Sequence, residues 1–272
     1  MKVAALQMVS STSLQANLDT ARDLLARAAD QGAELAVLPE YFCLLGFKDT
    51  DKLQFAEHYG GGLIQDFLSQ CAFDFKLWIA GGTLPLAIAT PQPDNARVHN
   101  STLVYNPAGE CVARYDKMHL FRFDSGLERY DEARVLQPGT EAVAFDLPSL
   151  DGHTYRVGLS ICYDLRFPEL YRALKADLLL VPSAFTHTTG QAHWEILLRA
   201  RAIENLAYVL ASAQGGLHEN ARRTWGHSMV VDPWGNILVQ LPEGAGVVMA
   251  DVLQASLQAD RTRLPALGHA VL

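Results

Sequence analysis

Three reactive side chains stand at the ends of strand-like runs in this sequence. Cys162 lies in VGLSICYDLRFPEL, directly after an apolar run and before Pro168, which suits the first turn of a helix. A side chain at a strand-to-helix turn projects from the carboxyl end of a sheet, where neighbouring amide groups are expected to lower the pKa of a thiol. Glu40 ends the run ELAVLPE, and Lys117 follows a run in RYDKMHLF. A thiol, a carboxylate and an ammonium can act together as nucleophile, general base and oxyanion stabiliser.

Each of these residues also has an ordinary structural interpretation. A lone cysteine is often buried, a lone lysine is usually solvated, and Glu40 could cap a helix. A serine hydrolase is disfavoured because Gly158-Leu-Ser160-Ile-Cys162 departs from G-x-S-x-G. Histidines for a cysteine protease are present, but no papain-like or caspase-like signature accompanies them. No HxxxH or HExxH spacing occurs, so we expect neither a metal nor an organic cofactor.

The order of sequence patterns predicts an α/β protein. Apolar runs typical of strands alternate with segments of helical period, which favours helices packed on sheets. Strands are expected at 3–8, 34–40, 77–81, 99–106, 111–118, 143–147, 155–161, 177–183 and 207–213, and helices at 14–28, 63–71, 168–175 and 191–205. A hairpin is expected through 232–235 and a long loop at 120–138. Two similar halves predict a four-layer α-β-β-α sandwich, as one domain over 1–272 with a weakly patterned tail from about 252.

Composition restricts the partners and the compartment. The 272 residues are 49% hydrophobic, which is typical of a soluble globular protein. The net charge of −8 disfavours nucleic acid and anionic membranes as partners. Four scattered cysteines predict neither a zinc ribbon nor a disulfide framework, and the N-terminal segment lacks the apolar core of a signal peptide. No run reaches the roughly 18 apolar residues of a membrane helix. We therefore expect a cytoplasmic protein.

Three motifs together resemble those of the carbon–nitrogen hydrolase (nitrilase) superfamily, whose Glu-Lys-Cys triad places each member at the end of a strand. LAVLPE ends in Glu40, YDKMHLF contains Lys117 and ICYDLRFPEL contains Cys162, in the order of the family. The likeness runs from LQM near residue 6 to GHSMVVDPWG at 226–235. The resemblance implies a catalytic triad of these residues, a thioester on the cysteine and no cofactor. It also implies a second active-site glutamate, which YDEARVLQPG places at Glu132, although Asp131 beside it leaves the choice open.

Two longer segments narrow the resemblance to one branch. PSAFTHTTGQAHWEILLRARAIEN at 182–205 and RRTWGHSMVVDPWGN at 222–236 are similar to the Nit branch, and within it to deaminated glutathione amidases. This likeness implies an amide substrate derived from a 2-oxo dicarboxylic acid, with deaminated glutathione giving 2-oxoglutarate and cysteinylglycine. Omega-amidases, which act on 2-oxoglutaramate, share the triad. Nitrile hydrolysis and a non-catalytic member that binds a metabolite or partner remain alternatives. The family also implies a homodimer or larger homo-oligomer.

Three residues are predicted to bind the substrate, because of their chemical groups and their positions relative to Cys162 in the sequence. The backbone N–H of Tyr163 would hold the oxyanion together with Lys117. Arg166, four residues after the thiol, would bind the 2-oxo acid end, with a further hydrogen bond from Thr186. Arg166 could instead pair with an acid nearby, Asp164 or Glu169. For the carboxylate of the leaving dipeptide the sequence offers three arginines without choosing among them: Arg122, Arg222 and Arg223.

Overall fold

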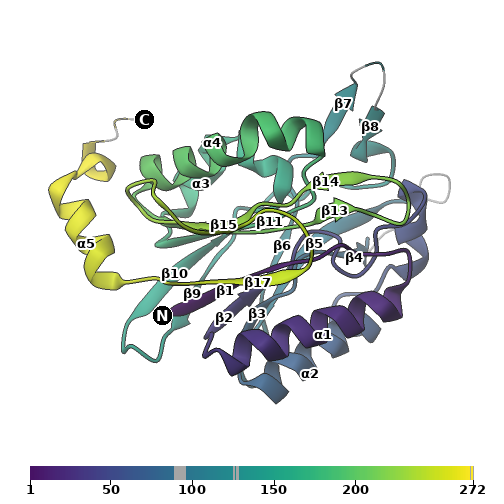
Figure 1. Cartoon of the computed structure of the whole chain (residues 1–272), viewed down its shortest axis with the longest axis horizontal. Helices are drawn as coiled ribbons and strands as arrows, with labels where there is room; N and C mark the ends of the chain where they lie inside the picture. Colours follow the sequence, from purple (N-terminus) through teal and green to yellow (C-terminus); the bar gives the residue numbers. More distant parts are fainter. Residues whose placement is uncertain (89–95, 125, 127–128, 270, 272) are drawn as a thin grey trace.

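Two sheets of matching design form the centre of the protein (Figure 1). The computed structural model describes residues 1–88, 96–124, 126, 129–269 and 271. In each sheet three parallel strands stand at the middle and antiparallel strands flank them. The first sheet has the order β17 (Gly246–Asp251), β1 (Lys2–Gln7), β2 (Leu35–Val37), β3 (Trp78–Ala80), β5 (Val98–Tyr105) and β4 (Leu84–Ala87), with β6 (Cys111–Asp116) also paired to β5. The second has the order β16 (Ile237–Leu241), β15 (Ser228–Val231), β12 (Tyr208–Ala213), β11 (Leu178–Ser183), β10 (Thr154–Leu159) and β9 (Ala144–Pro148).

Helices cover the outer face of each sheet. In Figure 1, α1 (Leu14–Asp30) and α2 (Leu63–Phe75) lie below the first sheet, and α3 (Pro168–Leu174) and α4 (His187–Asn205) lie above the second. The predicted four-layer α-β-β-α sandwich is therefore confirmed. No helix in the described part of the chain has the length and apolar character needed to cross a membrane.

The alternation of side chains along β1 shows how the layers are held together. Val3 and Ala5 join the apolar core that includes the space between the sheets, whereas Ala4 and Leu6 pack with α1 and α2. A strand sends successive side chains to opposite faces, so a strand covered on both sides must be apolar throughout. This requirement explains why the strand at 3–8 could be predicted from a continuous apolar run.

Helix α1 matches its predicted apolar stripe. Its buried face consists of Asn17, Leu18, Ala21, Leu24, Leu25 and Ala28. The hydroxyl of Ser13 caps the first turn by accepting a hydrogen bond from the Ala16 N–H at 3.4 Å. Burial of each leucine contributes roughly 1.5–3 kcal/mol to folding, so the stripe, more than the cap, fixes this helix on the sheet.

Three segments differ from the sequence prediction. Helix α4 begins at His187 rather than at 191, and Thr186 is its N-cap. The predicted loop at 120–138 contains the short strands β7 (Arg122–Asp124) and β8 (Arg129–Asp131) and the turn η2 (Glu132–Arg134). The weakly patterned tail forms α5 (Gln254–Arg263) and the turn η4 (Ala266–His269), and α5 buries a single side chain, Leu257. With so few buried positions, α5 carries almost no periodic signal.

The remaining elements are short. Strands β13 (Gly215–Leu217) and β14 (Arg223–Trp225) pair with each other, as do β7 and β8. Each sheet has a parallel strand that is followed by a 3-10 turn. In the first sheet η1 (Asp49–Phe55) comes after β2, and in the second η3 (Cys162–Arg166) comes after β10. Both turns lie on connections that leave the carboxyl ends of parallel strands, where the candidate site residues are found.

A substitution at Gly190 tests how closely the first turns of α4 pack against Trp225. Gly190 lies in the first turns of α4 against the Trp225 side chain, and a Cβ there would overlap the Cβ and ring of that tryptophan. We expect Gly190→Ala to lower the free energy of unfolding by about 2 kcal/mol, because overpacking outweighs the better helix propensity of alanine. Urea denaturation measures the change. Gly61→Ala is the matched control, since open space surrounds Gly61. Equal stability of the two variants would contradict this explanation.

Candidate active site

The predicted nucleophile stands on a strained elbow. Strand β10 ends at Leu159, and Cys162 follows with φ of 49°, in the left-handed region that residues with a side chain rarely adopt. The 3-10 turn η3 starts at Cys162, and Pro168 then occupies the first turn of α3. This backbone conformation holds the thiol at the carboxyl end of a central parallel strand. The residue is 8% exposed.

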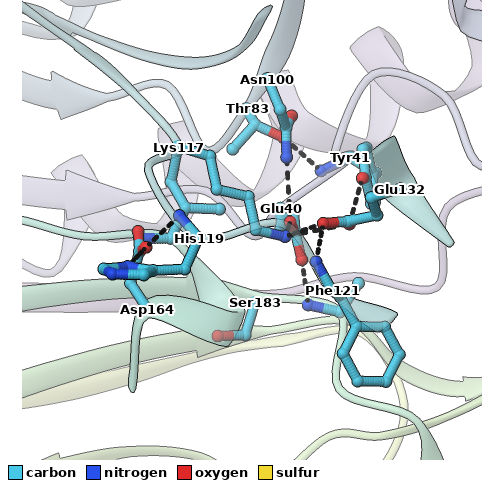
Figure 2. Close-up of polar contacts among 12 residues, drawn as sticks. Glu40, Tyr41, Thr83, Asn100, Lys117, His119, Phe121, Glu132, Asp164 and Ser183 are labelled. Atoms are coloured by element: carbon cyan, nitrogen blue, oxygen red, sulfur yellow. Dashed lines mark hydrogen bonds and ion pairs between the residues drawn. The ribbon is translucent and has the colours of Figure 1, made fainter. Parts of the chain in front are cut away.

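The predicted acid and lysine meet in the same place. Glu40 follows β2 of the first sheet, and Lys117 follows β6. The Lys117 Nζ donates to Glu40 Oε1 at 2.9 Å, and both residues are 1% exposed (Figure 2). Two residues 77 positions apart in sequence therefore form a buried ion pair. The charges of Glu40 and Lys117 both act on the pKa of the Cys162 thiol.

Further donors hold the Glu40 carboxylate from both sheets. Its Oε1 also accepts a hydrogen bond from Asn100 Nδ2 at 2.9 Å, and Asn100 lies in β5 of the first sheet. Its Oε2 accepts from the backbone N–H of Ala184 at 2.9 Å, directly after β11 of the second sheet. The carboxylate thus connects the two sheets at their carboxyl ends, and its position is fixed by backbone as well as by side chains.

Glu132 supplies a second carboxylate to Lys117. The Nζ lies 2.8 Å from Glu132 Oε2, and Glu132 also accepts from the Tyr41 hydroxyl at 2.9 Å and from the Phe121 N–H at 2.7 Å. Figure 2 shows Lys117 between the two glutamates. Of the two neighbouring acids that the sequence left open, Glu132 is the one that reaches the ammonium.

Lys117 and Glu132 stabilise each other in their ionised forms. Burial lowers the pKa of Lys117, but the charges of Glu132 and Glu40 outweigh that effect and raise the pKa well above its ordinary value. Burial raises the pKa of Glu132, and the charge of Lys117 with its hydrogen bond reverses the shift and lowers it. The surroundings of Lys117 therefore favour its charged ammonium form.

The thiol itself is held in its neutral form. Burial raises the pKa of Cys162 well above its ordinary value, and the negative charge of Glu40 acts in the same direction, while Lys117 opposes them. The expectation that backbone amides at the elbow would lower this pKa is wrong, because desolvation and the neighbouring carboxylate are stronger here. A base must consequently remove the proton before the sulfur can attack a substrate.

Asp164 is a site residue that our sequence analysis treated only as a possible partner of Arg166. Its buried carboxylate accepts hydrogen bonds from Ile161 N–H at 2.8 Å, from the Tyr115 hydroxyl at 2.7 Å and from His119 N–H at 3.0 Å. These donors come from the cysteine elbow and from both sides of Lys117. Asp164 therefore sets how the thiol and the ammonium lie relative to each other, and pairing with Arg166 is wrong.

Two further residues that hold the glutamates, Asn100 and Tyr41, were not predicted from the sequence. Asn100 stands in a strand-like run where a buried polar side chain is unusual, and Asp164 is a charge inside an apolar motif, so both carried a recognisable signal. Tyr41 carried none. It has φ of 57°, and its N–H donates to Thr83 Oγ1 at 2.8 Å, a conformation set by tertiary contacts.

Two of the predicted substrate-binding residues, Tyr163 and Arg166, lie in the turn η3 that begins at Cys162, and the third, Thr186, precedes α4. Tyr163 is the second residue of η3, where backbone N–H groups have no acceptor within the turn. Both terminal nitrogens of Arg166 lie close to His193 Nδ1, at 3.4 and 3.3 Å, and the guanidinium lies over the rings of Tyr163 and Phe185. Thr186 Oγ1 accepts from the Thr189 N–H at 3.3 Å as the N-cap of α4. The predicted roles of all three stay predictions. The described residues contain no group of three or more His, Cys, Asp and Glu side chains placed to hold a metal ion.

Comparison with known proteins identifies the family. Residues 2–262 match the model of the carbon-nitrogen hydrolase family. The chain belongs to the carbon-nitrogen hydrolase family. It is 41% identical to the deaminated glutathione amidase of Synechocystis sp., over 98% of this chain and 97% of that protein, and 38% identical to the Yersinia enterocolitica protein of the same name, over 98% and 92%.

Solved structures of the same family have the same architecture. The Caenorhabditis elegans NitFhit protein superposes with a TM-score of 0.85 at 35% identity, covering 99% of this chain and 65% of that one. Saccharomyces cerevisiae Nit3 gives 0.83 at 29% identity, covering 97% and 94%. This carbon-nitrogen hydrolase is therefore an enzyme that hydrolyses the carbon–nitrogen bonds of amides, and its substrate is a small molecule.

The titration of the Cys162 thiol tests the electrostatics of the site. We expect Glu40→Gln to lower the pKa of this thiol, because it removes a negative charge that raises it, and Lys117→Met to raise the pKa further. Alkylation by iodoacetamide across a pH series, resolved by peptide mass spectrometry, reports Cys162 separately from the other cysteines. Glu169→Gln, an exposed acid of α3, is the control with the same change of charge. An unchanged or raised pKa in Glu40→Gln would refute the proposed charge arrangement.

Proposed function

We propose that this enzyme hydrolyses the amide bond of deaminated glutathione, giving 2-oxoglutarate and cysteinylglycine through a thioester on Cys162. The observation that carries the proposal is the buried contact of Lys117 with both Glu40 and Glu132 next to the cysteine elbow. The substrate is supported by the relatives at 38–41% identity over nearly the whole chain that are named deaminated glutathione amidase.

Glu40 starts the reaction as a general base. Its carboxylate takes the proton from the neutral Cys162 thiol, and the sulfur forms a bond to the amide carbon while the carbonyl π electrons move to oxygen. Lys117 and the backbone N–H of Tyr163 hold the resulting oxyanion. Because the thiol is neutral at rest, proton transfer to Glu40 and attack by sulfur belong to one step.

Collapse of this intermediate releases the amine. The electron pair on oxygen re-forms the carbonyl, the carbon–nitrogen bond breaks, and the proton on Glu40 moves to the leaving nitrogen. Glu40 is then a carboxylate again and removes a proton from water, whose oxygen attacks the thioester. The carbon–sulfur bond breaks, the sulfur recovers that proton from Glu40, and the carboxylic acid product leaves. Protons and electrons balance without a metal or an organic cofactor.

Glu132 acts through Lys117 and positions the water or substrate. It supplies the larger share of the charge that raises the pKa of Lys117, which keeps the ammonium protonated while Glu40 alternates between acid and base. One oxyanion donor typically accelerates such a reaction by about 10²–10³-fold, so loss of the lysine charge would be severe.

The acyl end of the substrate would be bound near Arg166. Its planar guanidinium suits the 2-oxo acid carboxylate, and Thr186 lies at the start of α4, which also carries His193. The same triad chemistry would hydrolyse 2-oxoglutaramate or a nitrile, which therefore stand as alternative substrates. A non-catalytic binding role is the remaining alternative, and the charged cluster around an uncharged thiol argues against it.

We also propose a homodimer or larger homo-oligomer, a single domain over 1–272 and a cytoplasmic location. On α4 the large apolar side chains Ile196 and Ile203 are 70% and 46% exposed, which supports an interface there. All four cysteines are free, which supports a reducing compartment. The net charge of −8 supports the absence of nucleic acid and anionic membrane as partners.

Side-by-side assays of wild type and variants test the proposed reaction. We expect wild type to give a higher kcat/KM for deaminated glutathione than for 2-oxoglutaramate or a nitrile. Cys162→Ala should be folded by circular dichroism and essentially inactive, and Glu40→Gln and Lys117→Ala should lose activity by several orders of magnitude. Cys111→Ala, which removes an exposed cysteine, should keep the wild-type rate. Retention of most activity by Cys162→Ala would refute the mechanism, and a preference for another substrate would refute the assignment.

A further inference from the structure

Two cationic side chains lie beside the active site without a role in the triad. Lys52 of η1 and Arg222, which directly precedes β14, line one surface hollow next to Tyr41. The Lys52 Nζ is 4.4 Å from the centre of the Tyr41 ring, and the hydroxyl of that ring donates to Glu132. Tyr41 therefore touches both the hollow and the acid that holds Lys117, and Figure 2 shows its contact with Glu132.

The hydrogen-bond donors of both cations are largely unused. Within the described part of the chain the Lys52 ammonium donates no hydrogen bond, and it lies over the Tyr41 ring. The Arg222 guanidinium forms an ion pair with Asp49 Oδ1 at 3.8 Å, beyond hydrogen-bond distance, and lies 5.0 Å from the centre of the Tyr130 ring. Two like charges with free donors on one hollow form an arrangement that an anion stabilises.

The protein backbone holds these two residues together. Asn220 Nδ2 donates to Gly46 O at 2.7 Å and to Leu45 O at 3.2 Å, which ties the segment before Arg222 to the segment that leads into η1. Burial lowers the pKa of Lys52, and the charges of Glu132 and Asp49 oppose that shift. Lys48 also lines the hollow, so positive charge remains in excess over the acid Asp49.

We propose that Lys52 and Arg222 bind the carboxylate of the leaving group, and so select amides whose amine portion ends in a carboxylate. This inference rests on the proposed hydrolysis of deaminated glutathione. The cysteinylglycine portion ends in a carboxylate, and two extended residues span roughly 7 Å, so this charge lies well away from the reacting carbon. The other carboxylate of the substrate is assigned to Arg166, which contacts His193 of α4 rather than Tyr41.

The structure distinguishes among the three arginines that the sequence left open. Arg223 is already paired with Glu243 at 2.9 Å, and Arg122 is an exposed residue of β7. Arg222 alone shares a hollow with a second cation close to Tyr41. Guanidinium and ammonium groups together can satisfy both oxygens of a carboxylate.

A pair of substrates that differ only in this carboxylate tests the inference. We compare deaminated glutathione with its C-terminal carboxamide, using the wild-type enzyme and the double variant Lys52→Met/Arg222→Gln. Wild type should prefer the carboxylate by about ten- to a hundredfold in kcat/KM, and the double variant should lose this preference, mainly through a higher KM for the carboxylate. The single variant Arg222→Lys should retain part of the preference for the carboxylate, because lysine keeps the positive charge.

Matched controls separate recognition from folding. Arg223→Gln removes the neighbouring arginine, and Lys76→Met removes a lysine that also lies over an aromatic ring, 3.7 Å from Phe73, at the end of α2. Both should keep the wild-type preference. A wild-type enzyme without preference, or a double variant that keeps it, would overturn the inference, as would an equal loss of activity on both substrates. Failure of the proposed function looks different, since wild type would then hydrolyse neither compound.

Discussion

The whole site depends on one buried ammonium, that of Lys117, held between the carboxylates of Glu40 and Glu132. Removing an ion from water costs several kcal/mol even after relaxation, and only close opposite charges with further hydrogen bonds offset that cost. Here the two carboxylates also accept hydrogen bonds from Asn100, Ala184, Tyr41 and Phe121. Loss of either glutamate would remove one ion-pair partner of Lys117 and would leave buried hydrogen-bond donors without their acceptor, so each glutamate stabilises the cluster.

This requirement explains the role of the paired sheets. Glu40 follows a strand of the first sheet and contacts the N–H of Ala184 behind a strand of the second, so the sandwich must close before the carboxylate has all its partners. Asp164 connects the cysteine elbow and the lysine segment in the same way, through a backbone N–H of the elbow and through a backbone N–H and a hydroxyl on either side of the lysine. The neutral thiol of Cys162 and the anionic Glu40 then form a nucleophile and base that are ready for proton transfer.

Much of this arrangement could be predicted from the sequence, because apolar runs and helical periods report burial directly. The triad could be proposed from its place at the ends of such runs and from its resemblance to a family. The start of α4 could not, because the contact of Gly190 with Trp225 joins segments that are distant in the sequence. The direction of the pKa shift of Cys162 was also wrong from sequence, because it depends on the distance to Glu40 and on burial. Tyr41 acts through contacts between distant segments, which no local pattern encodes, whereas Asn100 and Asp164 stand out as polar residues inside apolar runs but their partners cannot be read from those runs.

The most direct test of covalent catalysis by this cluster is the partitioning of the acyl group between water and hydroxylamine. Deaminated glutathione and 2-oxoglutaramate differ only in the amine that leaves, so a common thioester on Cys162 must give the same ratio of hydroxamate to 2-oxoglutarate from both. The account predicts equal ratios at every hydroxylamine concentration. A ratio that changes with the leaving group would show that no shared acyl-enzyme forms, and would contradict it.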